Sequence, residues 1–229
     1  MRHRHTTPFE MVEFKFHCKM PIFVARQWVR HRTANINEYS LRYSEARDEF
    51  YLPDPEHIQF QSSLNKQGRL GEVSDSLKAK VSDYFQEISN RSFEIYSELN
   101  DAGVARELAR AVLPVNLYTE WYWKNDLHNL LHFVGLRSDS HAQYEIRVFS
   151  DAMAESVKKV APFAWEAYQD YVISGLRFSR IEQSLLEQNL PERVIDDILE
   201  DIAYQITASL NHNKPVSYTH LTLPTIYSV

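Results

Sequence analysis

The chain of 229 residues contains a single cysteine and only five glycines. A lone Cys18 excludes an internal disulfide and a cysteine-rich metal site. The few glycines form neither a G-x-G-x-x-G motif nor a phosphate loop, and no serine lies in a G-x-S-x-G motif. Any bound nucleotide or flavin is therefore expected to be held by side chains and helix ends.

Long apolar runs are missing as well. No stretch approaches the ~20 consecutive apolar residues that a membrane-spanning helix needs, and the basic N-terminus lacks the apolar segment of a secretory signal. The composition, which is 44% hydrophobic, is sufficient to bury a core. We therefore expect a globular, cytoplasmic protein with no membrane partner.

Charge is unevenly distributed along the chain, although the formal net charge is only -6. Residues 1–47 contain nine lysines and arginines against four acids, whereas residues 181–205 contain one basic residue against seven acids. A basic region can attract a phosphate-bearing ligand or a nucleic acid. The acidic region is more simply interpreted as a solvated helix face.

Hydrophobic periodicity predicts an α+β fold with long helices packed on a small antiparallel or mixed sheet, in a single domain that is not a Rossmann domain. Apolar and polar residues alternate in 11–19 and 115–124, which predicts two strands, and Cys18 is expected on the buried face of the first. Residues 33–39 are read as a loop. Helices are expected at 21–31, 76–103 (with Ser74 or Ser76 as N-cap), 105–113, 126–137, 140–160 (with a capping box at Ser140 and Gln143), 162–173 and 191–207.

The stretch from 30 to 44 concentrates groups that bind phosphate. Residues 30–32 read Arg-His-Arg, and guanidinium groups make bidentate, charge-assisted bonds to phosphate. An isolated triplet is more often a surface cluster. Here, if the chain is extended from Ile36, Glu38, Ser40 and Arg42 point to one side and offer an acceptor, a hydroxyl and a cation. The stretch therefore predicts two adjoining sites for phosphate-bearing ligands.

Two further chemistries are weighed and set aside. His128 and His132 have the spacing of metal ligands on one helix face, but no third ligand is evident, so no metal site is predicted. Ser40 has no histidine and acid placed by the sequence to activate it, so it is interpreted as a hydrogen-bond donor to substrate and not as a nucleophile.

Longer motifs point to a known family. The segment "RQWVRHRTANINEYSLRYS" contains an Arg-His-Arg triplet, seven residues and then a serine. It is preceded by "HRHTTPFEMVEFKFHCKMPIFVA" and followed by "ARAVLPVNLYTEWYWKNDLHNLLHFVGLRSDSHAQYEI". This ordered set, spanning roughly residues 1–170, resembles the flavin-dependent thymidylate synthases, and several ordered motifs carry a far lower false-positive risk than one.

The resemblance implies a specific activity and assembly. Members of that family are homotetramers that bind FAD at active sites between subunits, without a Rossmann domain. They methylate dUMP to dTMP, with methylenetetrahydrofolate as carbon donor and NADPH as reductant of the flavin. Small-molecule partners and no nucleic acid are therefore expected.

The resemblance also implies site residues, position by position. Arg137 is similar to the catalytic arginine of the family, and the simpler alternative is a helix C-terminal arginine that interacts with the helix dipole. Because no thiol attacks the uracil ring, a fixed cation is needed beside it to favour its ionised form. The implied flavin contacts are Thr7, Arg30, His31, Arg32, Glu38, Asp126, Leu127, His128 and His132. The implied dUMP contacts are Gln27, Arg30, Glu38, Tyr39, Ser40, Leu41, Arg42, Arg110 and Arg137.

Both ends of the chain depart from the family pattern. The sequence begins inside the "HRHTTPFE" region, so residues 1–207 are expected to form the family domain without its N-terminal part. Residues 208–229 are expected to be a disordered or non-native tail. Two alternatives stay open, namely an inactive fragment or scaffold of the same fold and a nucleic-acid-binding protein that uses the basic N-terminal region with its interleaved aromatics.

Overall fold

The computed structural model describes residues 5–63 and 68–189, and the predicted helix at 191–207 and tail at 208–229 lie outside these ranges. The chain divides into two compact units, residues 6–156 and a second unit containing 157–189. Within the described residues, no helix is long and apolar enough to cross a membrane. The residues of the predicted site all belong to the first unit, which is described first.

A three-stranded antiparallel sheet forms the centre of the first unit, with strand order β1-β5-β2. The two predicted strands are confirmed as β1 (Glu13–Pro21) and β5 (Tyr118–Asp126), and they pair along their whole length in the register Glu13 to Asp126. β2 (Asn35–Glu38) was wrongly predicted as a loop. This four-residue strand is too short and too rich in asparagine to show a strand period. Its pairing with β5 supplies the strand geometry.

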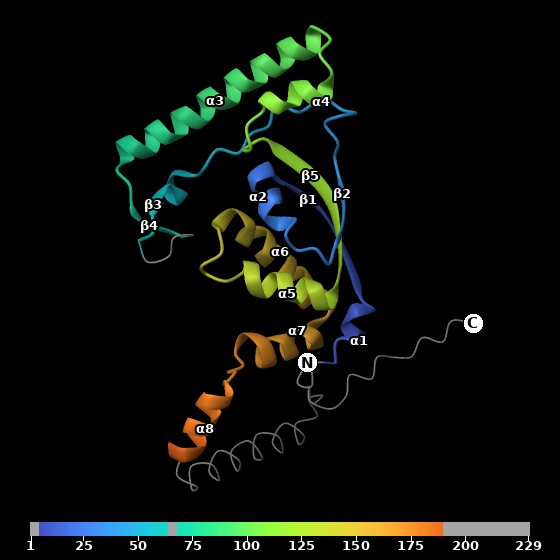
Figure 1. Ribbon diagram of the computed structural model, residues 1–229, viewed down its shortest axis with the longest axis vertical. Coiled ribbons are helices and arrows are strands. Elements are labelled where there is room, and N and C mark those ends of the chain that lie inside the picture. Colours follow the sequence, from blue (N-terminus) through green and yellow to red (C-terminus); the bar gives the residue numbers. More distant parts are fainter. Residues whose placement is uncertain (1–4, 64–67, 190–229) are drawn as a thin grey trace, which may run out of the picture. The chain divides into compact units, whose positions relative to one another are not determined.

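Helices α2 (Ile22–Trp28) and α5 (Leu127–Arg137) pack on one face of this sheet (Figure 1). Trp28 of α2 is the centre of the core, because its ring lies within 5.0–5.5 Å of the rings of Trp121, Trp123 and Phe133. Cys18 is buried on the same face, and burial raises the pKa of its thiol to about 12. The predicted structural cysteine is therefore confirmed.

A second core lies where the chain enters β5. The long helix α3 (Asp75–Asp101) begins at the predicted N-cap Ser74, whose hydroxyl accepts a hydrogen bond from Leu77, and ends before Gly103, which has a φ of 78°. Tyr96 of α3 is buried with Leu117 and receives a hydrogen bond from the backbone amide of Ala46 (2.8 Å). This core therefore fixes the segment that follows β2.

The remaining elements of the first unit are short, apart from α6. The predicted helix at 105–113 is α4 (Arg106–Ala109) followed by the 3-10 turn η2 (Arg110–Val112). The predicted start of the helix at Ser140 was wrong, because α6 (Tyr144–Val160) begins after a turn over 139–142. Unpredicted elements are α1 (Thr7–Glu10), the 3-10 turn η1 (Pro55–His57) and a hairpin of β3 (Gln59–Gln61) and β4 (Arg69–Glu72).

The second unit is helical in its described part. The predicted helix at 162–173 is α7 (Pro162–Tyr168), which continues as a π-helical turn η3 (Gln169–Ile173). Trp165 packs on Tyr168 at 5.4 Å and on the ammonium group of Lys158 at 5.0 Å. An unpredicted helix α8 (Arg180–Asn189) follows.

Candidate active site

The Arg-His-Arg triplet begins just beyond the C-terminal end of α2. Arg30 and Arg32 are exposed, whereas His31 is half-buried and its backbone amide donates to the carbonyl of Trp28 (2.9 Å). The His31 ring lies edge-on to Phe133, 4.9 Å between centroids. Helix α2 thus turns one member of the triplet inward and leaves two guanidinium groups on the surface.

His31 holds Arg137, the predicted catalytic residue. Nε of Arg137 donates a hydrogen bond to Nε2 of His31 at 2.9 Å. Burial, together with the charges of Arg137 and His132, lowers the pKa of His31 to about 4, so the ring is neutral near pH 7 and can accept this bond. Burial also lowers the pKa of Arg137, but a guanidinium remains cationic at this pH. The neutral imidazole therefore fixes a full positive charge.

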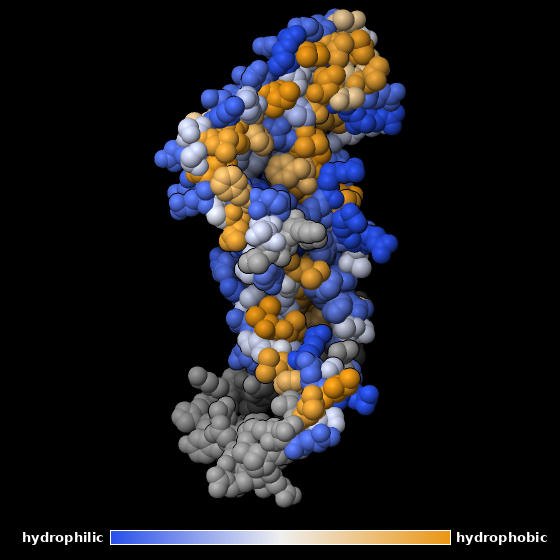
Figure 2. All heavy atoms as spheres, turned by 60° about the vertical axis from the view of Figure 1, so that its left-hand side comes forward, coloured by the Kyte–Doolittle hydropathy of each residue, from blue (hydrophilic) through white to orange (hydrophobic). Residues whose placement is uncertain are grey.

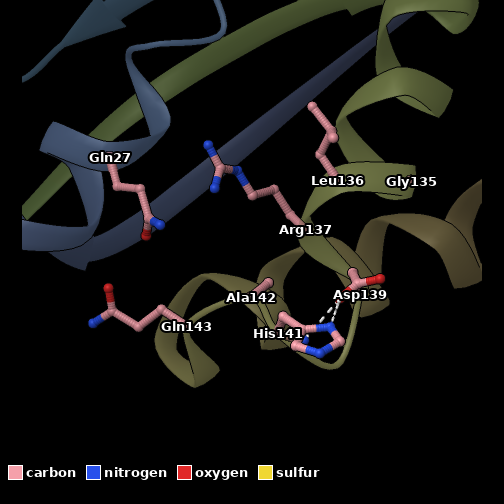
Figure 3. A pocket seen from close by; sticks show the side chains of 8 residues that line it. All are labelled: Gln27, Gly135, Leu136, Arg137, Asp139, His141, Ala142 and Gln143. Carbon is pink, nitrogen blue, oxygen red and sulfur yellow. Dashed lines mark hydrogen bonds and ion pairs between the residues drawn. The ribbon is translucent and has the colours of Figure 1, made fainter. Parts of the chain in front are cut away.

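Arg137 lines a cavity of about 490 Å³ (Figure 3). Gln27 contributes from α2, and the segment joining α5 to α6 forms the opposite wall. The side-chain oxygen Oε1 of Gln27 is buried and has no hydrogen-bond partner among the described residues. A buried polar atom without a partner is unfavourable, so an incoming donor would satisfy it. The lining residues are Gln27, Gly135, Leu136, Arg137, Asp139, His141, Ala142 and Gln143.

The wall opposite α2 was missed in the sequence, and it is built on an aspartate turn. Oδ1 of Asp139 accepts hydrogen bonds from both the backbone amide and the ring Nδ1 of His141, each 2.8 Å. These bonds lower the pKa of Asp139. The signal was present as an Asp-x-His pattern in "SDSHAQ", since an aspartate commonly bonds the amide two residues on. The capping-box interpretation of Ser140 obscured it.

Several predicted flavin contacts lie on or near α5, and some of their side chains are exposed whereas others are buried or already hydrogen-bonded. His128 and His132 are exposed on one face of α5, and His132 lies 6.4 Å from the ring of His31. Thr7 is exposed at the start of α1, which packs on α5. In contrast, Leu127 is buried, and both carboxylate oxygens of Asp126 are occupied by Asn129, at 2.8 and 2.7 Å, as the N-cap of α5. Within the described residues no group of three metal ligands forms.

A second group of predicted residues lies at the turn after β2, next to α4. Glu38 accepts a hydrogen bond from Thr119 (2.7 Å), and the Tyr39 hydroxyl donates to the carbonyl of Glu45 (2.9 Å). Ser40 and Arg42 were expected on one extended face with Glu38, which was wrong. The chain turns instead, and the Ser40 hydroxyl accepts a bond from the amide of Arg42 (3.3 Å).

Charged neighbours fix this turn. Arg42 pairs with Glu107 of α4 at 2.9 Å, and Arg106 pairs with Glu45 at 2.8 Å. Leu41 packs into the second core, and Arg110 is half-buried where α4 ends. Among the described residues, no hydrogen bond or ion pair joins this turn to Gln27, His31 or Arg137. One chain thus presents two separate groups of predicted contacts.

Within residues 5–47, the described part of the basic N-terminal region, the cations do not form a continuous groove. Lys19 pairs with Glu49, Arg47 with Glu120 at 2.9 Å, and Lys124 with Glu13 at 2.6 Å. Acids therefore alternate with the cations on the exposed face of the sheet, which argues against a nucleic-acid interface there.

Comparisons with known proteins show which family the chain is similar to. Residues 1–163 match the family described as "Thymidylate synthase complementing protein". A protein of Ehrlichia ruminantium (strain Gardel) named flavin-dependent thymidylate synthase is 53% identical over 188 residues, covering 82% of this chain. One of Dictyostelium discoideum with the same name is 48% identical over 190 residues, covering 83%. The chain spans 63% and 62% of the lengths of these two relatives.

A solved structure is similar as well. A crystal structure of the UMP/dUMP methylase PolB from Streptomyces cacaoi, bound with 5-Br UMP, superposes with a TM-score of 0.70 at 34% identity, covering 74% of this chain and 78% of that one. The family match covers well over half of the chain and includes α2, β5 and α5, the elements that position His31 and Arg137. The chain therefore belongs to the thymidylate synthase complementing protein family, whose curated relatives are flavin-dependent thymidylate synthases.

Proposed function

We propose that this chain is a flavin-dependent thymidylate synthase that methylates dUMP to dTMP, with methylenetetrahydrofolate as carbon donor and FAD reduced by NADPH. One observation carries the proposal. The Arg137 guanidinium is held by a neutral His31 on the wall of a cavity that Gln27 also lines, and Oε1 of Gln27 is buried with no hydrogen-bond partner among the described residues. A fixed cation and an amide are the groups that an ionised uracil ring requires.

In this scheme Arg137 supplies electrostatic stabilisation. Negative charge must build on the pyrimidine before its ring carbon can attack the methylene carbon, and the guanidinium favours that charged form. His31 accepts from Nε of Arg137, and the two terminal nitrogens have no hydrogen-bond partner among the residues that the structure describes, so they can bind a ligand. Gln27 supplies an amide that hydrogen-bonds the ring and sets its orientation. No side-chain nucleophile is needed, in keeping with the raised pKa of the buried Cys18.

The residues around α5 fit a flavin. The exposed guanidinium groups of Arg30 and Arg32 suit its pyrophosphate. His128 and His132 are both exposed on α5, and the His132 ring lies beside His31. Thr7, Glu38, Asp126 and Leu127 complete the proposed contacts. Asp126 and Leu127 would contribute backbone groups, because the Asp126 side chain is already hydrogen-bonded and the Leu127 side chain is buried. When bound, the flavin supplies the hydride that completes the methyl group.

The turn after β2 is proposed to bind the nucleotide phosphate. Ser40 offers a hydroxyl, and Arg42 and Arg110 offer cations, with Arg30, Tyr39, Leu41 and Glu38 as the other proposed dUMP contacts. Since this turn and the Arg137 cavity are separate groups in one chain, we propose that active sites are completed between copies in a homotetramer. Such an arrangement places the turn of one copy against the cavity of another.

Exposed apolar side chains support an oligomer. Phe60 and Leu70 of the hairpin, with Tyr84 and Ile88 of α3, are each more than half exposed. Figure 2, which brings the α3 side of Figure 1 forward, shows apolar side chains at this surface. Large exposed apolar patches commonly mark protein interfaces.

The proposal is tested on the purified chain. We expect a yellow protein with the absorbance of bound flavin, a mass in solution of four copies, and NADPH oxidation that rises when dUMP is added with methylenetetrahydrofolate. Tritium release from dUMP labelled at ring carbon 5 measures the methyl transfer itself. A colourless protein that binds neither FAD nor dUMP would contradict the proposal and favour a scaffold role.

A further inference from the structure

The cavity wall opposite α2 has no regular secondary structure of its own. Residues 139–142 form a turn between α5 and α6, stabilised by the aspartate contacts and by a bond from the Ala142 amide to the Asp139 carbonyl (2.9 Å). Such a turn fixes its internal shape but not its position relative to Arg137. Arg147 of α6 donates a hydrogen bond to the carbonyl of Ser140 (3.1 Å), so that position depends on how α6 is held. The wall ends at Gln143, directly before the first turn of α6.

The side chains of Tyr51, His57 and Arg69 contact that first turn. Nη2 of Arg69 donates to both carboxylate oxygens of Glu145, each at 2.8 Å. The Tyr51 hydroxyl donates to Oε1 of the same carboxylate at 2.8 Å. The His57 ring lies 3.6 Å from the ring of Tyr144 between centroids. Tyr144 and Glu145, which directly follow the cavity wall, are therefore both held by side chains from outside α6.

Burial strengthens the hydrogen bonds and the ion pair that Glu145 makes with Tyr51 and Arg69. The Glu145 side chain is only 4% exposed, and burial pushes the pKa of its carboxyl upward. Hydrogen bonds from Arg69, from its own backbone amide and from Tyr51 outweigh this effect, and the net pKa lies below its ordinary value. Removing one partner of such a pair leaves a buried charge without compensation, so the wall would shift or solvent would enter.

Tyr51, His57 and Arg69 are themselves fixed by further hydrogen bonds. Nη1 of Arg69 donates to the carbonyl of His57 (3.1 Å), which joins two of these three residues. Nδ2 of Asn116, at the entry to β5, donates to the carbonyl of Tyr51 (3.1 Å) and to the hydroxyl of Ser89 in α3 (3.0 Å). Hydrogen bonds thus connect Ser89 of α3 and Asn116, through Tyr51, to Glu145.

We propose that Arg69 and Glu145, with Tyr51 and His57, are positioning residues that set the affinity of the cavity for a uracil nucleotide without touching it. The inference rests on the proposed function, because dUMP is the probe. A purely structural role predicts loss of stability alone. A positioning role predicts weaker dUMP binding at temperatures where the variants are fully folded.

The test uses the flavin-loaded chain and the variants Arg69→Met, Glu145→Gln and the double variant. We expect each single variant to weaken dUMP binding, measured by calorimetry, roughly tenfold, as for couplings through packed networks. We expect kcat at saturating dUMP to stay within about threefold of the parent, so that the change appears in KM. The double variant should weaken binding no more than the weaker-binding single variant, since the pair acts as one unit.

Arg91→Met is the matched control. It removes an exposed arginine that pairs with Glu94 (3.0 Å) on α3, and it should change neither dUMP binding nor KM. Arg69→Lys keeps the charge but lacks a second nitrogen placed to bond the His57 carbonyl as well as Glu145. Its dUMP affinity should therefore fall between those of the parent and Arg69→Met. This graded series is interpretable even if one variant folds poorly.

Unchanged dUMP affinity in folded Arg69→Met and Arg69→Lys, with only a lower melting temperature, would overturn the inference and leave the proposed function intact. Failure of the unaltered, flavin-loaded chain to bind dUMP would overturn both. Weaker binding that appears equally in Arg91→Met would also count against positioning, since that side chain lies outside the hydrogen-bonded network.

Discussion

The two groups of predicted contacts in this chain are built in opposite ways. Gln27 and Arg137 line a cavity from regular helices, and His31, which follows α2, accepts a hydrogen bond of 2.9 Å from Arg137. The residues at 39–42 lie on a turn, and Arg42 is held there by an exposed ion pair to Glu107. The first group is preorganised within one chain, whereas the second has the exposed, adaptable geometry of a surface that meets a ligand or another copy.

The largest effect is expected at Arg137. Arg137→Ala removes the fixed cation beside the pyrimidine and should lower kcat by about 10³-fold, in the range found when one electrostatic stabiliser is removed. Tritium release from labelled dUMP measures this loss. If Arg137→Ala and Ser40→Ala were tolerated equally, the distinction between a preorganised group and an adaptable one would fail.

His31 is expected to come next, because it holds Arg137. His31→Phe keeps a ring of similar shape against Phe133 but removes the acceptor for Nε of Arg137. We expect kcat/KM for dUMP to fall roughly 10- to 100-fold, as when an outer hydrogen-bond partner of an active group is lost. His31→Gln, which restores an acceptor, should recover part of the activity. No recovery would indicate that the ring acts only through flavin contact.

The lowered pKa of His31 also predicts a dependence of stability on pH. Its folded value of about 4 lies below the ordinary 6.5, so the unfolded chain binds a proton that the folded chain does not as pH falls through this window. The free energy of unfolding should therefore decrease from pH 6.5 to pH 4 by about 1–2 kcal/mol, after allowance for partial exposure of the ring. Urea unfolding of the parent and of His31→Phe measures the difference, which should vanish if the ring is not buried.

A smaller effect is expected at Ser40. Ser40→Ala removes a hydroxyl that accepts a long bond of 3.3 Å from the Arg42 amide and that is proposed to contact substrate. We expect activity to fall about three- to tenfold, with the change mainly in KM, since one neutral hydrogen bond contributes about 1 kcal/mol. Complete inactivity of this variant would contradict the interpretation of Ser40 as a hydrogen-bonding residue and favour a nucleophilic role for its hydroxyl.

The smallest effect is expected from Glu107→Gln. The ion pair with Arg42 is more than half exposed on both sides, and such pairs contribute about 0.5 kcal/mol or less to stability. Unfolding by urea should therefore hardly change. If Arg42 binds the nucleotide phosphate, releasing it from Glu107 should leave dUMP affinity unchanged or slightly increase it. A marked loss of affinity would mean that the pair itself shapes the site.

The sequence predicted the parts of the fold that have a strong period. β1 and β5 alternate over nine residues each, and α3 and α5 have N-caps, so these elements were found nearly at their true ends. β2 was missed because its strand form depends on pairing with β5, which is 80 residues away. The start of α6 was misplaced because the Asp139 turn competes with a helix for the same backbone amides.

The site was predictable to a similar degree. The Arg-His-Arg motif and the resemblance pointed to Arg137, but no local pattern indicates that His31 accepts its Nε hydrogen, because the two residues are 106 apart. The pair of Arg69 and Glu145 was likewise invisible, since it joins a weakly patterned hairpin to a helix start. Motifs thus identify chemical groups, whereas their mutual support arises only from tertiary contacts.

The burial of Cys18 makes it simple to attach a spectroscopic label to one chosen position of the chain. Its thiol is buried under the aromatic core and stays protonated far above neutral pH, so maleimide dyes and spin labels will not react with it in the folded protein. As the sequence has no other cysteine, a single one introduced at the exposed Leu136 on the cavity rim would be labelled selectively. A reporter there could follow nucleotide arrival in real time without first removing the native thiol.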